Sequence, residues 1–254
     1  MDGSAAWRFT TTPPVWRICP ARAFILSSTA AVYGEGDGRL LSEDCRLDPV
    51  NVYGRTKAMA EAAVMDIAAA AGLGVGILRY FNAAGADPFV RSGQASQHPH
   101  HLIELATHVA TGDRRMLSIF GTDYPTPDGT AIRDYVHVSD IADAHVLVMD
   151  ATLKQGGSRI YNMGTGEGSS VRTVIDALSA VCGHEVPVTQ AGRRAGDPAV
   201  LVADSRRLRN DLGWRPRYGL TDMLRHALLW EQARRRMPPR QPHREPSGRC
   251  ASEV

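Results

Sequence analysis

The sequence predicts an α/β fold built around a parallel β-sheet. Residues 23–26 are apolar and run into Ser27-Ser28-Thr29, which predicts a buried strand, and residues 75–80 predict a second one. Between them, residues 52–71 are rich in Ala, Met and Glu and predict a helix that ends at Gly72, a residue type favoured at helix C-caps. A strand, a helix and a second strand at this spacing are typical of a parallel βαβ unit.

The rest of the chain continues this mixture of helices, strands and loops, without an internal repeat. Glycines and a proline predict a loop over residues 34–49. Residues 1–22 show no periodicity and are expected to be irregular, and the Pro- and Arg-rich residues 237–254 are expected to form a disordered tail, which leaves 23–236 as the folded part. Further helices are predicted at 101–111, 141–153, 171–182, 205–212 and 221–235, and a further strand at 159–163.

The composition is typical of a soluble globular chain. Of 254 residues, 43% are hydrophobic and 22% are charged, and the mean hydropathy is −0.22. Apolar runs are far shorter than the ~20 residues that cross a bilayer, and no secretory signal is visible. A net charge of +2 gives no reason to expect nucleic acid or a membrane as partner. The cysteines (Cys19, Cys45, Cys182, Cys250) are scattered, so we expect no metal site, reduced thiols and a cytoplasmic location.

A tyrosine and a lysine in the first predicted helix are candidates for chemistry. Only two of the 29 basic residues are lysines, Lys57 and Lys154. Lys57 follows Tyr53 by four residues, so both side chains project from one helical face. A nearby ammonium favours the ionised phenol, which suits a general acid/base, and the hydroxyl of Ser28 or Thr29 could share a substrate proton. Taken alone, the same spacing also fits an ordinary surface pair.

Motifs on both sides of this pair support a functional interpretation. Residues 27–34 read SSTAAVYG, residues 53–57 read YGRTK and residues 78–85 read LRYFNAAG. Further motifs follow in order at 119–126, 129–138, 161–166 and 193–198. Together they resemble the extended short-chain dehydrogenases/reductases, and more closely the UDP-glucose 4-epimerase family, over about residues 23–232. The runs at 123–126 and 133–135 are specific to the epimerase branch.

The resemblance implies an incomplete Rossmann-like parallel sheet with a smaller sugar-nucleotide-binding subdomain, mainly residues 86–134 and 164–236. It implies that UDP-galactose and UDP-glucose are interconverted through a 4-keto intermediate with bound NAD, and it allows a homodimer. The implied catalytic residues are Tyr53, Lys57 and Thr29. Contacts to NAD are implied for Ser27, Tyr53, Lys57, Tyr80 and Phe81. Contacts to the UDP-sugar are implied for Ser28, Thr29, Asn82, His101, Phe120, Arg133, Arg194, Asp197 and, beside the sugar's 2-position, Leu201.

The glycine motif at 164–168 does not predict a dinucleotide site. It follows a strand and precedes a helix, but its spacing is G-x-G-x-G rather than G-x-G-x-x-G, and the resemblance implies a structural turn. Only 22 residues precede Ala23, and none forms the glycine-rich strand-to-helix turn that holds a pyrophosphate. We therefore expect the chain to lack the main NAD cradle, roughly the first hundred residues of a two-half dinucleotide domain. An apolar sheet edge is then expected to be exposed.

Two alternatives stay open at this point. A catalytically inactive remnant that binds UDP-sugars would follow from the missing cradle. A sugar-nucleotide 4,6-dehydratase shares the fold and the tyrosine, but it needs an acid/base carboxylate pair directly after Thr29, where this chain has Ala30 and Ala31.

Overall fold

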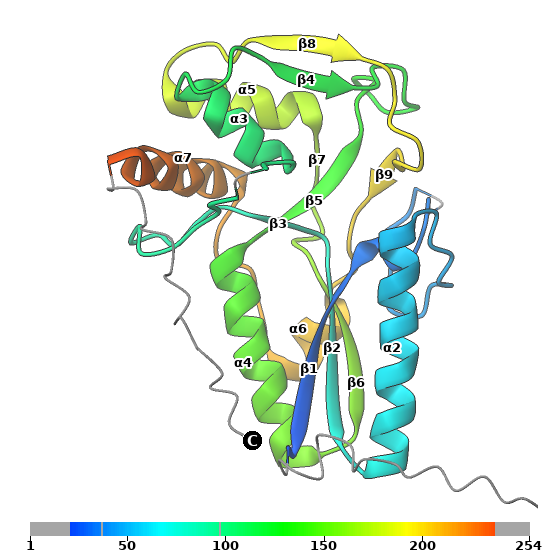
Figure 1. Cartoon of the computed structure of the whole chain (residues 1–254). Coiled ribbons are helices and arrows are strands. Elements are labelled where there is room, and N and C mark those ends of the chain that lie inside the picture. Colours follow the sequence, from blue (N-terminus) through cyan, green and yellow to red (C-terminus); the bar gives the residue numbers. More distant parts are fainter. Residues whose placement is uncertain (1–20, 37, 97, 237–254) are drawn as a thin grey trace, which may run out of the picture.

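A parallel sheet with one helix on each face forms the lower half of the molecule in Figure 1. The computed structural model describes residues 21–36, 38–96 and 98–236. Its strands β1 (Ala23–Thr29), β2 (Gly74–Tyr80) and β6 (Ser158–Met163) pair in the order β1-β2-β6. Helix α2 (Val52–Ala71) covers one face and α4 (Val138–Gln155) the other. This is the predicted α/β class, with the βαβ unit as expected.

Local sequence explains these elements. Helix α2 begins after Asn51, whose side chain accepts a hydrogen bond from the Gly54 N–H, and it ends at Gly72 in the left-handed conformation (φ 63°). Strand β2 is buried almost throughout because helices cover both of its faces. Gly76 lets α4 approach closely, since a Cβ there would lie 2.5 Å from the Val148 side chain.

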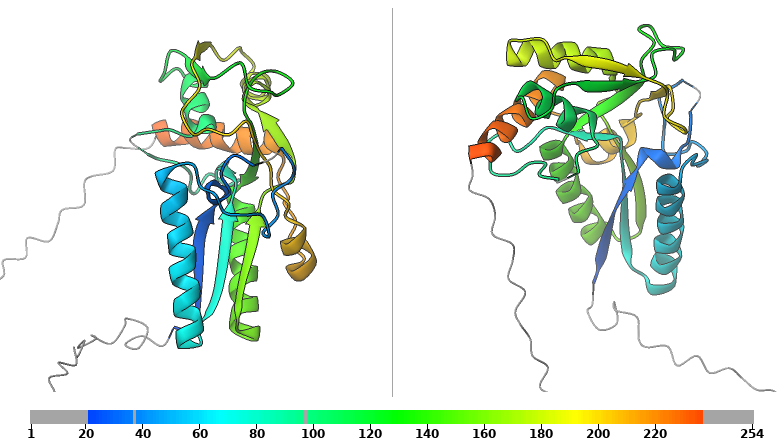
Figure 2. Two further views of the ribbon diagram at one scale, coloured as in Figure 1. Left: turned by 90° about the vertical axis from the view of Figure 1, so that its right-hand side faces the viewer. Right: turned by 45° about the horizontal axis from the view of Figure 1, so that its top comes forward.

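The upper half carries shorter strands and three helices. Strands β3 (Asn82–Ala84), β5 (Ile132–His137), β7 (Gly168–Ser170) and β9 (Val200–Leu201) pair around β5. Strands β4 (Leu117–Phe120) and β8 (Val188–Ala191) form a parallel pair. Helices α3 (Leu102–Ala110), α5 (Val171–Cys182) and α7 (Leu220–Arg236) pack on one another, as Figure 2 shows from two further sides. The short η1 (Ala30–Val32) follows β1, and α6 (Arg206–Leu212) packs on β6.

Most predicted helices are confirmed within a few residues, and α5 matches its prediction throughout. The start of α4 was predicted three residues late. Its N-cap is His137, whose Nδ1 accepts a hydrogen bond from the Ser139 N–H, and histidine is not among the usual capping residues. Strands β3, β4, β5, β7, β8 and β9 were not predicted. The segment expected up to residue 22 and the tail expected from residue 237 lie outside the described residues, apart from residues 21 and 22.

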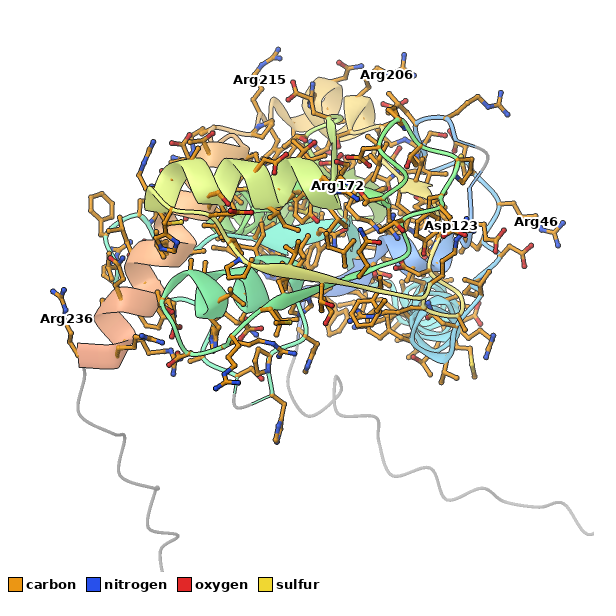
Figure 3. All side chains as sticks on the ribbon, turned by 90° about the horizontal axis from the view of Figure 1, so that it is seen from above. Arg46, Asp123, Arg172, Arg206, Arg215 and Arg236 are labelled. Atoms are coloured by element: carbon orange, nitrogen blue, oxygen red, sulfur yellow. The ribbon has the colours of Figure 1, made fainter. Side chains whose placement is uncertain are left out.

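The surface shows no single basic face among the labelled side chains. Arg46 and Arg236 lie at opposite sides of the view in Figure 3, Arg206 and Arg215 on a third side, and Arg172 between them. Strand β1 is an edge strand, since within the described ranges it pairs with β2 alone. Phe24 on this strand is 44% exposed, as expected for an open apolar edge. Among the described helices, none is both long and apolar enough to span a membrane.

Candidate active site

The first of two adjoining hollows lies at the carboxyl ends of β1 and β2, where ligands bind in parallel α/β sheets, and the second extends from it into the upper half. The first, of about 470 Å³, is lined by Ser28, Thr29, Tyr53, Tyr80 and Phe81 among others. The second, of about 260 Å³, is lined among others by Phe120, Arg133, Arg194 and Asp197. Asn82 and His101 line both hollows. Most of the residues to which the sequence assigned a role therefore converge on this end of the sheet.

Tyr53 and Lys57 occupy the start of α2, at the mouth of the first hollow. The Lys57 ammonium lies 5.9 Å from the centre of the Tyr53 ring and donates a hydrogen bond to the Ser27 carbonyl oxygen at 2.9 Å. Tyr53 is 56% exposed and lines the hollow, whereas Lys57 is half-buried and is not among the lining residues. A cation is thus held beside a phenol that faces the first hollow. The pair differs from an ordinary surface pair because Lys57 is hydrogen-bonded to Ser27 on β1.

Of the two hydroxyls left open by the sequence, Thr29 is the one available to a ligand. Its oxygen accepts the Ala31 N–H at 3.2 Å, so its own hydrogen is left to donate into the hollow. Ser28 is 2% exposed, and its hydroxyl donates to the Glu61 carboxylate. The Ser28 hydroxyl hydrogen is therefore already bound by Glu61, although Ser28 lines the first hollow, and its contact with a sugar stays a prediction.

A buried ion pair beneath the hollow was missed by the sequence interpretation. Arg79 donates to both oxygens of Glu61, at 2.7 Å from Nη2 and 3.1 Å from Nε, and both side chains are about 3% exposed. Arg79 also donates to the Tyr33 hydroxyl at 2.9 Å, which in turn donates to Asn162 at 2.6 Å. Burial raises the pKa of Tyr33 to about 12. One signal was present: Glu61 follows Lys57 by four residues, on the same helical face.

Tyr80 is held by two side chains. Its hydroxyl lies 2.7 Å from the Ser27 hydroxyl and 2.5 Å from Nε2 of His145 on α4. Burial raises the pKa of Tyr80, and the neighbouring Tyr53 adds to this rise. Tyr80 therefore stays neutral, and it is less exposed than Tyr53. His145 was not identified from the sequence, because it lies 65 residues from Tyr80.

The arginines of the second hollow differ in what already binds them. Arg133 is 8% exposed and pairs with Asp197, and it also donates to the Ile132 carbonyl at 2.7 Å. Arg194 stacks on Phe120, with its guanidinium carbon 3.8 Å from the ring centre. The hollow thus combines an aromatic face with a cation, a suitable surface for a base or a phosphate.

Leu201 does not line either hollow. It is 8% exposed and belongs to a buried apolar cluster with Ala30, Val32, Phe81 and Ala203. β9 directs this side chain into the core, and the expectation that Leu201 borders the sugar's 2-position stays a prediction.

The glycine turn at 164–168 is a structural turn, as predicted. The buried Asp134 carboxylate accepts hydrogen bonds from the Thr165 N–H at 2.7 Å, the Gly166 N–H at 2.9 Å and the Ala203 N–H at 3.1 Å. These amides point at a carboxylate of the chain itself, so they are not free to hold a phosphate.

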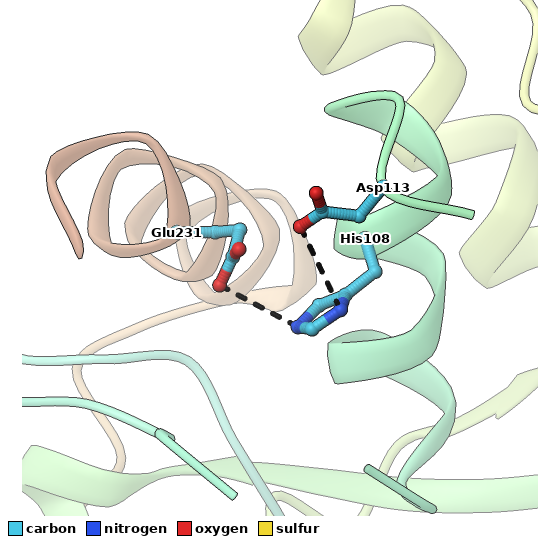
Figure 4. A group of neighbouring side chains, drawn as sticks. All are labelled: His108, Asp113 and Glu231. Atoms are coloured by element: carbon cyan, nitrogen blue, oxygen red, sulfur yellow. Dashed lines mark ion pairs between the residues drawn. The ribbon is translucent and has the colours of Figure 1, made fainter. Parts of the chain in front are cut away.

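One group of side chains has the spacing of a metal site, but its charges are already paired. His108, Asp113 and Glu231 join the end of α3 to α7 (Figure 4). His108 Nε2 lies 3.5 Å from Glu231, while Arg235 pairs with Asp113 and lies 3.4 Å from Glu231. Arg234 pairs with Glu231 at 2.8 Å. Two arginines beside two carboxylates make this an ion-pair network that fastens the two helices together.

Comparisons with known proteins agree with this geometry. Residues 14–164 match the NAD dependent epimerase/dehydratase family. A UDP-glucose 4-epimerase from Azospirillum brasilense is 51% identical over 210 residues, which are 82% of this chain and 60% of that protein. One from Corynebacterium glutamicum is 46% identical over 194 residues, 76% of this chain and 58% of that protein. The chain thus spans about three fifths of the length of these curated relatives.

Solved structures show the same likeness. A UDP-glucose 4-epimerase from Stenotrophomonas maltophila, with bound NAD and formylated UDP-arabinopyranose, superposes with a TM-score of 0.84 at 38% identity, over 87% of this chain and 66% of that chain. A UDP-glucose 4-epimerase from Bifidobacterium longum in complex with NAD+ and UDP has a TM-score of 0.83 at 35% identity, over 86% of this chain and 66% of that chain.

Proposed function

The chain belongs to the NAD dependent epimerase/dehydratase family, and from this premise we propose that it carries the catalytic residues and the sugar-nucleotide hollow of a UDP-glucose 4-epimerase. The reaction is the interconversion of UDP-galactose and UDP-glucose through a 4-keto sugar. One observation carries the proposal: Tyr53 and Thr29 line one hollow, with the Lys57 ammonium beside the Tyr53 ring, next to a second hollow that holds Arg194 and Phe120.

In this mechanism Tyr53 takes the proton from the sugar 4-hydroxyl and later returns it. The ammonium of Lys57 lies 5.9 Å from the Tyr53 ring centre, so a cation stands beside the phenol that exchanges this proton. Thr29 donates its hydroxyl hydrogen to the same sugar oxygen and so orients it. When bound, NAD supplies the acceptor and then the donor of the C4 hydride. Arg194 and Phe120 bind the uridine diphosphate, and the hexose is left with few fixed contacts so that it can turn.

The residues of this chain fit the nicotinamide end of that cofactor. Ser27, Tyr53, Lys57, Tyr80 and Phe81 gather at the carboxyl ends of β1 and β2, where an ammonium and hydroxyls can bind ribose oxygens and an aromatic ring can pack against a flat heterocycle. Among residues 21–36, 38–96 and 98–236, no glycine-rich strand-to-helix turn with free amides is present to bind the pyrophosphate.

The proposal is tested in a fusion protein that adds the part of a relative that this chain does not cover. The chain is fused to the part of the Azospirillum brasilense relative outside the aligned region, saturated with NAD, and assayed for UDP-glucose formed from UDP-galactose. We expect turnover in the fusion, and in its Tyr53→Phe variant a turnover lower by ~10²–10⁴-fold with unchanged UDP affinity. UDP binding without turnover in the unsubstituted fusion would favour the inactive remnant.

We also infer a cytoplasmic location and the capacity to form a homodimer. The location is supported by Cys45 and Cys182, which are free thiols in the described part of the chain and fit a reducing compartment. Sedimentation of the chain over a range of concentrations tests self-association.

A further inference from the structure

A chain of side-chain hydrogen bonds crosses the sheet from α4 to α2. It begins at His145 on α4, passes to the Tyr80 hydroxyl on β2 and then to the Ser27 hydroxyl on β1. The carbonyl of the same Ser27 accepts the hydrogen bond from Lys57 on α2. Four elements, β1, α2, β2 and the more distant α4, are thus linked at the carboxyl ends of two strands, and the last link is the ammonium beside Tyr53.

The orientation of the His145 ring follows from its second contact. Its Nδ1 lies 2.8 Å from the Ile141 carbonyl oxygen, which can only accept, so Nδ1 carries a hydrogen. Its Nε2 lies 2.5 Å from the Tyr80 oxygen, and the Tyr80 hydroxyl donates to the Ser27 hydroxyl oxygen at 2.7 Å. The backbone of α4 therefore fixes the ring that holds the Tyr80 hydroxyl.

The position of Ser27 depends on its hydrogen bond with Tyr80, because β1 is paired with a neighbouring strand on one side only. Within the described residues β1 pairs with β2 alone, and Ser27 stands opposite Leu78, two residues before Tyr80. The Tyr80 hydroxyl holds the Ser27 side chain while Lys57 binds its carbonyl. A shift of Ser27 would carry the partner of Lys57 with it and would move the ammonium relative to the Tyr53 ring.

We propose that His145 is a positioning residue for Lys57: it fixes the Tyr80 hydroxyl, which fixes Ser27, whose carbonyl holds the ammonium beside Tyr53. This inference rests on the proposed function for its catalytic meaning, but the geometry that it asserts belongs to the chain itself. His145 touches neither hollow, since it is not among the residues that line them, so its effect on the reaction passes through Tyr80.

The presence of only two lysines allows a direct test without cofactor or turnover. Lys57 is half-buried and bonded to Ser27, whereas Lys154 near the end of α4 is exposed and serves as an internal control. The purified chain is acetylated with limiting reagent, and the ratio of modified Lys57 to modified Lys154 is measured by mass spectrometry. In His145→Leu we expect this ratio to rise about threefold to tenfold, the change that accompanies loss of one ordinary hydrogen bond.

Two further variants make the result specific. His145→Gln keeps a polar group that can hydrogen-bond to the Tyr80 hydroxyl, so its ratio should stay near that of the unsubstituted chain. Tyr80→Phe keeps the ring and removes the hydroxyl, so it should match His145→Leu, and the double variant should show no further rise. Nitrogen-15 NMR of the ring should show the hydrogen on Nδ1 of His145 in the unsubstituted chain.

The outcomes separate this inference from the proposed function. An unchanged Lys57 ratio in a folded Tyr80→Phe chain, or equal ratios in the Leu and Gln variants, would overturn the positioning role. The expected labelling pattern together with a fusion that binds UDP but does not turn over would uphold the geometry of Lys57 and reject the epimerase assignment instead.

Discussion

Replacing Glu61 with glutamine tests the buried ion pair on which the candidate site stands. The carboxylate accepts from Arg79 at 2.7 Å and 3.1 Å and from the Ser28 hydroxyl, and it is 3% exposed. Glu61→Gln keeps the shape of the side chain and removes the charge. Arg79 is then left buried at 3% exposure with no opposite charge, and the amide hydrogens face existing donors.

The magnitude follows from burial. Removing one partner of a buried pair costs about 3–5 kcal/mol of unfolding free energy, because the remaining charge is uncompensated. For a domain of this size each 1 kcal/mol lowers the melting temperature by about 2–4 °C, so a fall of about 6–20 °C is expected. A domain is stable by about 5–15 kcal/mol in total, so this single substitution removes a large share.

Urea unfolding followed by far-ultraviolet circular dichroism measures this cost. The control is Arg225→Gln, which breaks the exposed pair with Asp222 (52% and 39% exposed) and should cost about 0.5 kcal/mol or less. A double variant, Glu61→Gln with Arg79→Met, removes both charges and should be more stable than Glu61→Gln alone. If Glu61→Gln costs no more than the control, or if the double variant is the less stable of the two, the buried-charge argument fails.

Three further predictions concern the hollows and the upper half. Arg194→Ala removes the cation on Phe120 and should weaken UDP binding about tenfold or more in calorimetry. The control Arg193→Ala should change UDP binding little, because Arg193 pairs with an aspartate outside the hollow. Burial lowers the pKa of His137 from 6.5 to about 4, so the folded state favours the neutral ring. The free energy of unfolding should therefore fall by on the order of 3 kcal/mol as the pH is lowered from 6.5 to 4. The variant His137→Gln should flatten this pH dependence in denaturant titrations. Gly85→Ala should lower unfolding free energy by about 1–3 kcal/mol, since φ is 83° and the new Cβ would lie 2.8 Å from the His137 ring; an unchanged midpoint would contradict this.

The elements that sequence predicted well are those whose stability is local. Helix α2 has a capping Asn51, a run of strong helix formers and a terminal Gly72, so both ends are encoded nearby. Strand β9 spans only Val200–Leu201 and exists because it pairs with β5. Strand β7 likewise depends on β5, in antiparallel register. Periodicity over two or three residues carries no signal, so strands of this kind require knowledge of their partners.

The residues of the candidate site also fall into those that local sequence places and those that only the tertiary structure brings together. Tyr53 and Lys57 are placed by helical spacing, and Thr29 by its position at the end of a strand, so their convergence on one end of the sheet could be predicted. Glu61 with Arg79 and Tyr80 with His145 could not, since each pair is made by residues on different elements. A charge or an imidazole in a sequence does not reveal whether its partner lies in the chain or in a ligand.

The arginines of the second hollow show why that distinction matters for function. By motif, Arg133 and Arg194 were equally suited to a diphosphate, and Arg193 differs from Arg194 by one position. The structure gives Arg133 a partner in Asp197 and Arg193 a partner in Asp123. Arg194 instead stacks on Phe120, and within the described residues no carboxylate is paired with it. A guanidinium that the protein has not already neutralised attracts an anion most strongly, so if the hollow binds UDP as proposed we expect Arg194 to contribute more than Arg133 to its affinity.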